Sequence, residues 1–251
     1  MSLYKYLPPE RIDVLENGTI AVSLPTERND PFDELAAVDW DTSDEELERQ
    51  HATRQIQSPL EEYKAFQRLQ KSQRSGEVAE RLRGKQAESF GAICLSRVWD
   101  SIPMWSYYAH EHRGFVVEFD ETHVAFQAQF GNGIVPIVYG NRSLVRGKLN
   151  LKEPLPQTIK APAWSHEQEM RLFYRLDQCA SPIIRGERNI YLADFPRESV
   201  TRVLLGCRIE PDCRSRVQQS LRRWGFTKTT LVALSPHHEH FSFFLEELSV
   251  F

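Results

Sequence analysis

Cysteine is scarce in this chain of 251 residues. The four cysteines are Cys94, Cys179, Cys207 and Cys213, and none lies in a CxxC pair or at a Cys/His ligand spacing. We therefore expect reduced cysteines and no bound metal, rather than a disulfide scaffold. Long apolar runs are also missing, because no stretch approaches the ~20 apolar residues of a membrane span. The first residues lack the pattern of a signal peptide, so we expect a cytoplasmic protein without membrane contact.

Charge of one sign is lacking as well. Lys and Arg total 31 against 35 Asp and Glu, a formal net charge of -4. This balance excludes a protein whose whole surface is a polycation for nucleic acid or lipid. Between residues 197 and 228, however, eight basic residues stand against three acidic ones. That stretch is either a solvated helix face or a guide for a phosphate-bearing acceptor.

Short strands and helices alternate along most of the chain without a regular βα order. We expect strands at 3–6, 19–24, 92–96, 113–119, 134–139, 170–174, 189–193, 202–205, 229–234 and 241–245, and helices at 9–16, 103–112 and 211–224. This pattern favours the α+β class. We expect a single domain, 1–251, that contains a helical insertion at 39–88.

The insertion is marked by its acidic start and by two helix-start signals. Ser43 with Glu46 forms a capping box, and Pro59 stands at the start of a second helix. The apolar residues Leu60, Tyr63, Phe66 and Leu69 lie at helical spacing there. Catalysis from this segment is not expected, but a lid or a partner surface is compatible with it.

Residues 164–171, WSHEQEMR, contain two carboxylates followed by an arginine. On a strand, Glu167, Glu169 and Arg171 would project from one face. A solvated face with an ion pair explains this spacing. The alternative is a carboxylate cluster that stabilises a positively charged transition state, with Arg171 orienting it.

Residues 104–115, MWSYYAHEHRGF, are dense in aromatic side chains with polar tips. Helical spacing predicts that Trp105, Tyr108, Ala109 and His112 share one face. Such a stripe is either part of a core or a stacking surface for a planar heterocycle.

Other segments carry polar groups without a periodic apolar face. They are 3–6, LYKY, and 28–32, RNDPF, in which a strand and an Asx-type turn are the simple structural interpretations. The run His237–His240 is better explained as a turn between strands than as a metal site. The sequence Gly131-Asn132-Gly133 is likewise interpreted as a turn.

The segments LYKY, RNDPF, MWSYYAHEHRGFVVEFD and WSHEQEMR together resemble a widespread bacterial family of unknown function, often found near phage-defence and toxin genes. That family is distantly similar to ADP-ribosyltransferases. The resemblance covers most of the chain outside the insertion. It implies an ADP-ribosyltransferase-like split β-sheet core with a cleft for NAD.

The resemblance also implies roles for individual residues. The catalytic set would be Glu169, Glu167, Tyr108 and Arg171, with Glu169 accepting a hydrogen bond from the nicotinamide ribose and stabilising the oxocarbenium-like transition state. The NAD-binding set would be Tyr4, Lys5, Tyr6, Arg28, Asn29, Asp30, Trp105 and Tyr107.

The implied function is an NAD-dependent ADP-ribosyltransferase that acts as a toxin or a phage-defence effector. Its acceptor would be a protein or a nucleic acid, and a neutralising or regulatory protein partner is compatible with this role. The alternatives are an NAD glycohydrolase and a non-catalytic module that binds a nucleotide or a partner.

Overall fold

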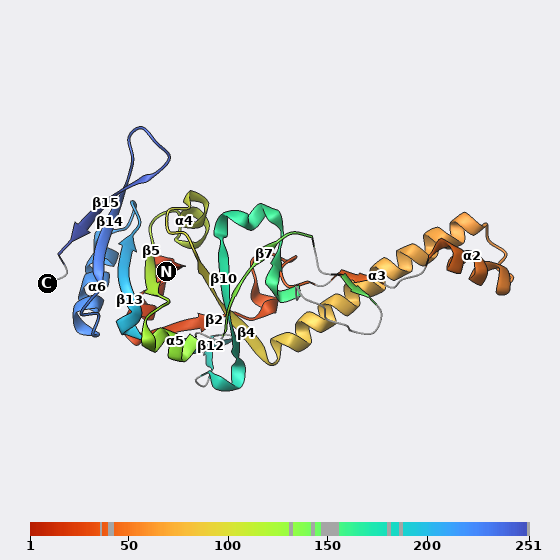
Figure 1. Cartoon of the computed structure of the whole chain (residues 1–251), viewed down its shortest axis with the longest axis horizontal. Coiled ribbons are helices and arrows are strands. Elements are labelled where there is room, and N and C mark those ends of the chain that lie inside the picture. The colour runs from red at the N-terminus through yellow and green to blue at the C-terminus, as the bar shows by residue number, and fades with distance from the viewer. Residues whose placement is uncertain are drawn as a thin grey trace. The chain divides into compact units, whose positions relative to one another are not determined.

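The computed structural model describes residues 1–35, 37–39, 43–130, 133–141, 144–146, 156–179, 182–185 and 188–249 (Figure 1). The chain divides into two compact units. The first unit consists of Met1–Leu24, Ser89–Ile137 and Ala163–Phe251, and the second of Pro25–Glu88 and Val138–Pro162. The predicted helical insertion falls within the second unit. The single-domain organisation stays a prediction.

An eight-stranded sheet forms the centre of the first unit. Its spatial order is β15 (Phe243–Leu248), β14 (Thr230–Pro236), β13 (Val200–Leu205), β5 (Phe115–Asp120), β1 (Ser2–Leu7), β4 (Phe90–Ser96), β10 (Glu169–Arg175) and β6 (Ile134–Pro136). Neighbouring strands are antiparallel except β13 and β14, which are parallel. The sheet is therefore mixed, and the expected α+β class is confirmed.

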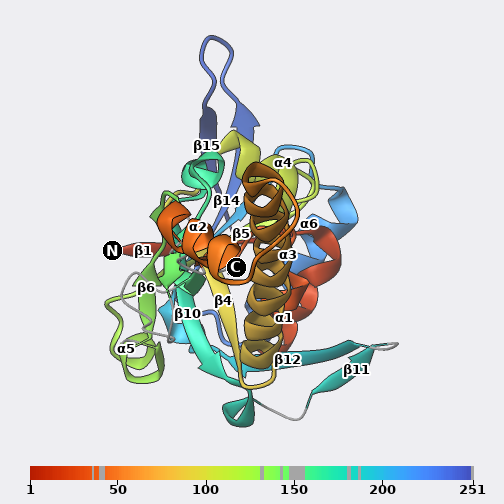
Figure 2. The same cartoon turned by 90° about the vertical axis from the view of Figure 1, so that its right-hand side faces the viewer.

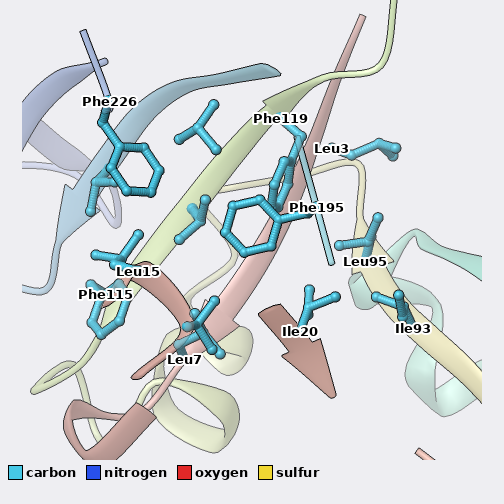
Figure 3. Packing of buried hydrophobic residues seen from close by; sticks show 14 of the residues in the cluster. Leu3, Leu7, Leu15, Ile20, Ile93, Leu95, Phe115, Phe119, Phe195 and Phe226 are labelled. Atoms are coloured by element: carbon cyan, nitrogen blue, oxygen red, sulfur yellow. The ribbon is translucent and has the colours of Figure 1, made fainter. Parts of the chain in front are cut away.

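One face of this sheet carries the larger hydrophobic core. Figure 3 shows Leu3 and Leu7 of β1 with Phe115 and Phe119 of β5 in that core. It is covered by α1 (Asp13–Asn17), α5 (Val124–Phe130), α6 (Pro211–Arg223) and a three-stranded sheet of β11 (Ile183–Arg185), β12 (Arg188–Asp194) and β2 (Thr19–Val22). Each fully buried large apolar side chain contributes about 1.5–3 kcal/mol to the free energy of unfolding.

The opposite face of the sheet packs against the short helix α4 (Ile102–Tyr108). Tyr4 and Tyr6 of β1 form a second core there with Trp105 of α4. Because side chains alternate along a strand, Lys5 lies on the face of Leu3 and Leu7 instead. The two faces of the sheet therefore differ, and the second one carries the polar residues discussed below.

Two expected helices differ from the structure. The helix expected at 103–112 ends at Tyr108, because His110, Glu111 and His112 have φ angles of 49°, 54° and 67°. Left-handed residues cannot continue a right-handed helix. The helix expected at 9–16 is divided into a 3-10 turn, η1 (Pro9–Ile12), and α1, and Arg11 within η1 has non-helical dihedral angles.

The expected strand at 134–139 is also divided. Its first part, β6, pairs with β10 in the first unit. Its second part, β7 (Val138–Tyr139), belongs to the second unit and pairs with β9 (Ile159–Lys160). A single run of apolar residues thus supplies strands to both units.

The two helices predicted for the insertion are present in the second unit as α2 (Asp44–Thr53) and α3 (Leu60–Ala87). The same unit contains a parallel pair of strands, β3 (Ala37–Asp39) and β8 (Leu144–Arg146). The Ser43 Oγ accepts a hydrogen bond from the Glu46 amide at 3.2 Å, which confirms the predicted cap. The predicted apolar stripe on α3 is not buried throughout, because Phe66 and Leu69 are exposed. Short 3-10 turns complete this unit at η2 (Pro25–Glu27) and η3 (Pro156–Thr158).

Within the part of the chain that the structure describes, no helix combines the length and the apolar character that crossing a membrane requires.

Candidate active site

The segment with the two predicted carboxylates bends where β10 begins. Glu167 is the last residue of η4 (Pro162–Glu167), and Gln168 has a φ of 42°. Glu169 is therefore the first strand residue, and the expectation that both carboxylates project from one strand is wrong. Within β10 the alternation is confirmed, because Met170 and Leu172 lie in the larger core. Glu169 and Arg171 lie on the opposite face.

Glu169 and Arg171 form a bidentate ion pair in the interior. The Arg171 Nε donates to Glu169 Oε1 at 2.7 Å, and Nη2 donates to Oε2 at 3.0 Å. Arg171 is 0% exposed and Glu169 is 5% exposed. A solvated ion pair, the simpler of the two expectations, is thus wrong. Two parallel hydrogen bonds fix the plane of the carboxylate, so Arg171 orients Glu169.

Glu167 is held from two sides. The Tyr108 hydroxyl, at the end of α4, donates to Glu167 Oε1 at 2.6 Å. The Ser96 Oγ donates to the backbone oxygen of Glu167 at 2.6 Å. Ser96 ends β4 and lies opposite Glu169 in the sheet register. One serine therefore places the two carboxyl-bearing residues at the same end of β10.

Ser96 was not predicted as a site residue. Its sequence context is that of an ordinary strand end, and its importance comes from the register between β4 and β10. A register of strands that are far apart in the chain has no local sequence signal. Sequence reasoning could not have found it.

An aromatic cluster lies next to Glu167. The rings of Tyr107 and Tyr108 are 6.5 Å apart, and those of Tyr107 and Trp164 are 6.4 Å apart, both edge to face. Tyr107 is 66% exposed, so its ring faces solvent. Trp164 was predicted as part of the motif but not as a site residue. The exposed ring of Tyr107 is compatible with the stacking surface that was one of the two interpretations of this segment, and a role in stacking stays a prediction.

Tyr4 lies in line with the carboxylates on the same face of the sheet. It pairs with Ser96, which in turn pairs with Glu169, so two strand spacings, about 9–10 Å, separate the backbones of Tyr4 and Glu169. The Tyr4 hydroxyl donates to Glu118 Oε1 at 3.3 Å, and Arg202 donates to the other carboxyl oxygen of Glu118. Burial, and then the charge of Glu118, raise the pKa of Tyr4. Its hydroxyl is therefore a neutral donor.

Two predicted NAD ligands, Trp105 and Tyr6, are parts of the scaffold. Trp105 is 0% exposed, and its indole N–H donates to the Trp99 carbonyl at 2.7 Å. Tyr6 is buried against the Trp105 ring, and its hydroxyl donates to the Val98 carbonyl at 3.0 Å. Burial raises the pKa of Tyr6. Neither ring presents a face on which a nicotinamide could stack.

Lys5 differs from Tyr4 and Tyr6 in direction. It lies on the other face of the sheet, and its Nζ donates to the Cys94 carbonyl at 2.9 Å. The sheet itself lies between the Lys5 side chain and the face that carries Glu169. The structure therefore does not bring Lys5 together with the carboxylates.

Arg28, Asn29 and Asp30 belong to the second unit. The Arg28 Nε donates to Glu34 Oε1 at 2.9 Å, and both side chains are nearly buried. Asp30 Oδ1 accepts from the Phe32 amide at 2.9 Å, which confirms an Asx-type turn here. A role of these residues in binding NAD stays a prediction.

The remaining motifs form no metal centre among the described residues. The segment 237–240 lies in the turn between β14 and β15, as predicted. Gly131 and Asn132 lie outside the described residues.

The assembled group can fix negative charge in a poorly hydrated place. Two carboxylates, Glu167 and Glu169, are oriented by Tyr108 and Arg171, and both are buried. Fixed charges of this kind stabilise a cationic transition state more strongly than solvated ones. The exposed ring of Tyr107 offers a surface for a planar group.

Comparison with known protein families gives a match to part of the chain. No curated protein and no solved structure matches the chain. Residues 104–172, which run from within α4 to Leu172 of β10, match the family described as "Protein of unknown function (DUF2971)". This match agrees with the expected resemblance to a family of unknown function.

Proposed function

We propose that this protein is an NAD-consuming ADP-ribosyltransferase. NAD is the substrate, and the acceptor is a protein or a nucleic acid. The proposal includes an ADP-ribosyltransferase-like split core, to which the eight-stranded and the three-stranded sheets of the first unit would contribute. It also includes a role as a toxin or a phage-defence effector, restrained by a partner protein.

The observation that carries the proposal is the pair of buried, oriented carboxylates at the start of β10. Breaking the bond between ribose and nicotinamide leaves positive charge on the sugar. A carboxylate that is already fixed at that position needs no reorganisation when the charge develops. Glu169, fixed by Arg171, has this property.

The neighbouring groups provide roles for the rest of the reaction. Glu167 would accept a proton from the acceptor or position it, with the Tyr108 hydroxyl fixing its orientation at 2.6 Å. The exposed face of Tyr107 would pack against the nicotinamide ring. Trp164 supports the Tyr107 ring through an edge-to-face contact.

The test is the release of nicotinamide from NAD by the purified protein. Replacing Glu169 with Gln removes the charge at nearly constant volume, and we expect kcat to fall by about 10²–10³. The matched control is Glu246→Gln, the same change at an exposed position of β15, which should leave the rate unaltered. Equal rates in the wild type and in Glu169→Gln would refute the assignment.

Loss of the Glu169 charge also leaves Arg171 without its bidentate partner. Breaking a buried pair in this way costs about 3–5 kcal/mol, so the variant has to be checked for folding by circular dichroism. Tyr108→Phe provides a second variant, because it removes one hydroxyl from a partly buried side chain. We expect it to lower kcat without changing the fold.

Product analysis with NAD labelled in its adenine distinguishes transfer from hydrolysis. Label attached to protein or nucleic acid supports the transferase. Free labelled ADP-ribose, formed in amounts equal to the nicotinamide, would instead identify an NAD glycohydrolase that uses the same carboxylates. No turnover together with NAD binding would identify a non-catalytic module.

A further inference from the structure

The first unit has a concave pocket away from the carboxylates. It has a volume of about 450 Å³ and lies between the loop that joins β14 to β15 and the chain at His112 and Arg208. Figures 1 and 2 show that the β14–β15 hairpin extends well beyond the rest of the sheet. Small-molecule sites usually have volumes of about 300–1,000 Å³. The size of this pocket therefore suits a ligand of mononucleotide size.

Rings form much of the wall of this pocket. On the hairpin, the His237 ring stacks on His240 at 4.7 Å and on Phe244 at 4.2 Å between centroids. The His237 Nδ1 also accepts hydrogen bonds from the amides of Glu239 and His240, at 3.0 and 3.2 Å. These contacts give the loop a defined shape. Phe241, at its tip, is 99% exposed and also lines the pocket.

A fully exposed phenyl ring is unfavourable in water. A planar ligand that covers the ring would remove its apolar surface from water, which is favourable. Nucleobases have planar rings, and they typically stack on aromatic side chains such as histidine and phenylalanine. The ring-lined wall thus favours an aromatic ligand over an aliphatic one.

Arg208 places a guanidinium group at the same pocket. Its side chain is exposed, and the neighbouring carboxylate of Glu111 is already bound by Arg113. Guanidinium groups bind phosphate through paired hydrogen bonds. Glu239 also lines the pocket and carries the opposite charge, so recognition depends on the position of the anion rather than on net charge.

His112 also lines the pocket, and its ring contacts Phe243 of the hairpin. The Ser106 hydroxyl donates to the Ile102 carbonyl at 3.1 Å, so it accepts from the His112 Nε2–H at 3.3 Å. The other ring nitrogen, Nδ1, then carries a lone pair. It is buried and has no hydrogen-bond partner among the described residues. Because Nδ1 is shielded from solvent, its lone pair is not presented to a ligand in the open pocket.

We propose that this pocket binds a nucleoside monophosphate, with the base against the hairpin rings and the phosphate on Arg208. A base has the planar face that the hairpin rings accept, and the phosphate suits the exposed guanidinium group. The site is separate from the proposed catalytic group, and the inference does not require that the protein consume NAD.

Isothermal titration calorimetry of the full chain tests the proposal with three probes. They are adenosine 5′-monophosphate, adenosine, which lacks the phosphate, and ribose 5-phosphate, which lacks the base. We expect the complete nucleotide to bind at least tenfold more tightly than either fragment. Binding of ribose 5-phosphate as tight as that of the nucleotide would overturn the role of the rings.

Two variants separate the contributions. Arg208→Gln should weaken nucleotide binding about tenfold and leave adenosine binding unaltered, whereas Phe241→Ala should weaken both. Both side chains are exposed, so neither change should disturb folding. The matched control is Arg214→Gln, which removes the same charge from an exposed position of α6 outside the pocket.

Nucleotide binding at this pocket should not depend on the carboxylates of the candidate active site. We expect Glu167→Gln to bind the nucleotide as the wild type does. Binding that is lost in Glu167→Gln but kept in Arg208→Gln would overturn the proposal and place the nucleotide at the catalytic group. No binding of the nucleotide at millimolar concentration would overturn it as well.

Discussion

His112 has an imidazole ring that folding partly removes from water. The ring is stacked on Trp105, with 6.1 Å between centroids and an interplanar angle of 10°. Burial lowers the pKa of His112, and the charge of the neighbouring Arg208 lowers it further. The folded protein therefore resists protonation of this side chain more than the unfolded chain does.

This shift predicts a loss of stability in mild acid. As the pH falls below the unfolded pKa of about 6.5, the unfolded chain takes up a proton that the folded protein does not, until the folded pKa is reached. In that window one such histidine lowers the free energy of unfolding by at most about 1.4 kcal/mol per pH unit. Replacing His112 with Asn, which tolerates a positive φ, should make this slope shallower.

Urea unfolding of the wild type and of His112→Asn between pH 7.5 and 5 measures the two slopes. A constant offset between the proteins reflects packing and does not bear on the prediction, because only the slope reports the proton. His238→Asn serves as the control, since His238 is exposed and should leave the slope as it is. Parallel slopes for the wild type and His112→Asn would contradict the expectation.

At the scale of elements, α4 shows what the sequence could and could not predict. Spacing of aromatic residues correctly predicted a helix, but it left open whether Trp105 lies in the core, where the structure places it. It did not predict the end of the helix, because Ala109, His110 and Glu111 have no proline or glycine to mark one. The left-handed turn at 110–112 is stabilised by long-range backbone contacts, such as the Arg208 amide on the His112 carbonyl at 3.0 Å.

The same limit applies to the candidate site. The sequence identified Glu167, Glu169, Tyr108 and Arg171, which the structure brings to one end of β10. It could not show that Trp105 and Tyr6 belong to the core, because both core and site use aromatic residues at the same spacing. The direction of each side chain depends on strand register, which is set by partners far away in the sequence.

The glycines of α3 allow a prediction for a whole element. At Gly84 a Cβ would meet no atom within 4 Å, and the position is helical. Alanine is favoured over glycine inside a helix by about 1 kcal/mol. Gly84→Ala should therefore stabilise α3 by about 0.5–1 kcal/mol, measured as a higher midpoint in the thermal loss of helical circular dichroism.

Gly206→Ala is the same substitution as Gly84→Ala, but we expect it to have the opposite effect on stability. A Cβ at Gly206 would lie 2.1 Å from the His112 carbonyl oxygen and 2.9 Å from that of Gly114, both backbone atoms. Because backbone cannot move aside cheaply, we expect a loss of at least about 1–3 kcal/mol in the first unit. If Gly84→Ala and Gly206→Ala change stability in the same direction, the space around each glycine does not determine the sign of the change.

At the scale of the molecule, burial is distributed unevenly between the two units. In the first unit, β5 lies inside the sheet, and five of its six residues are buried. In the second, α3 has 28 residues, all described, of which Tyr63, Lys64 and Ala79 are buried. Few buried contacts and many solvent-exposed backbone hydrogen bonds mark a segment that opens at low free energy.

Hydrogen exchange of the intact chain should reveal this difference. Amides of 115–120 and 200–205 are expected to exchange only through global unfolding, since β5 and β13 pair at the centre of the sheet. Amides of 60–75 in α3 should exchange on the order of 100-fold faster or more, through opening of the helix alone. Gly84→Ala should slow exchange in α3 and leave β5 unchanged. Equal protection of α3 and β5 would mean that the two units unfold as one cooperative structure, contrary to the distribution of buried residues.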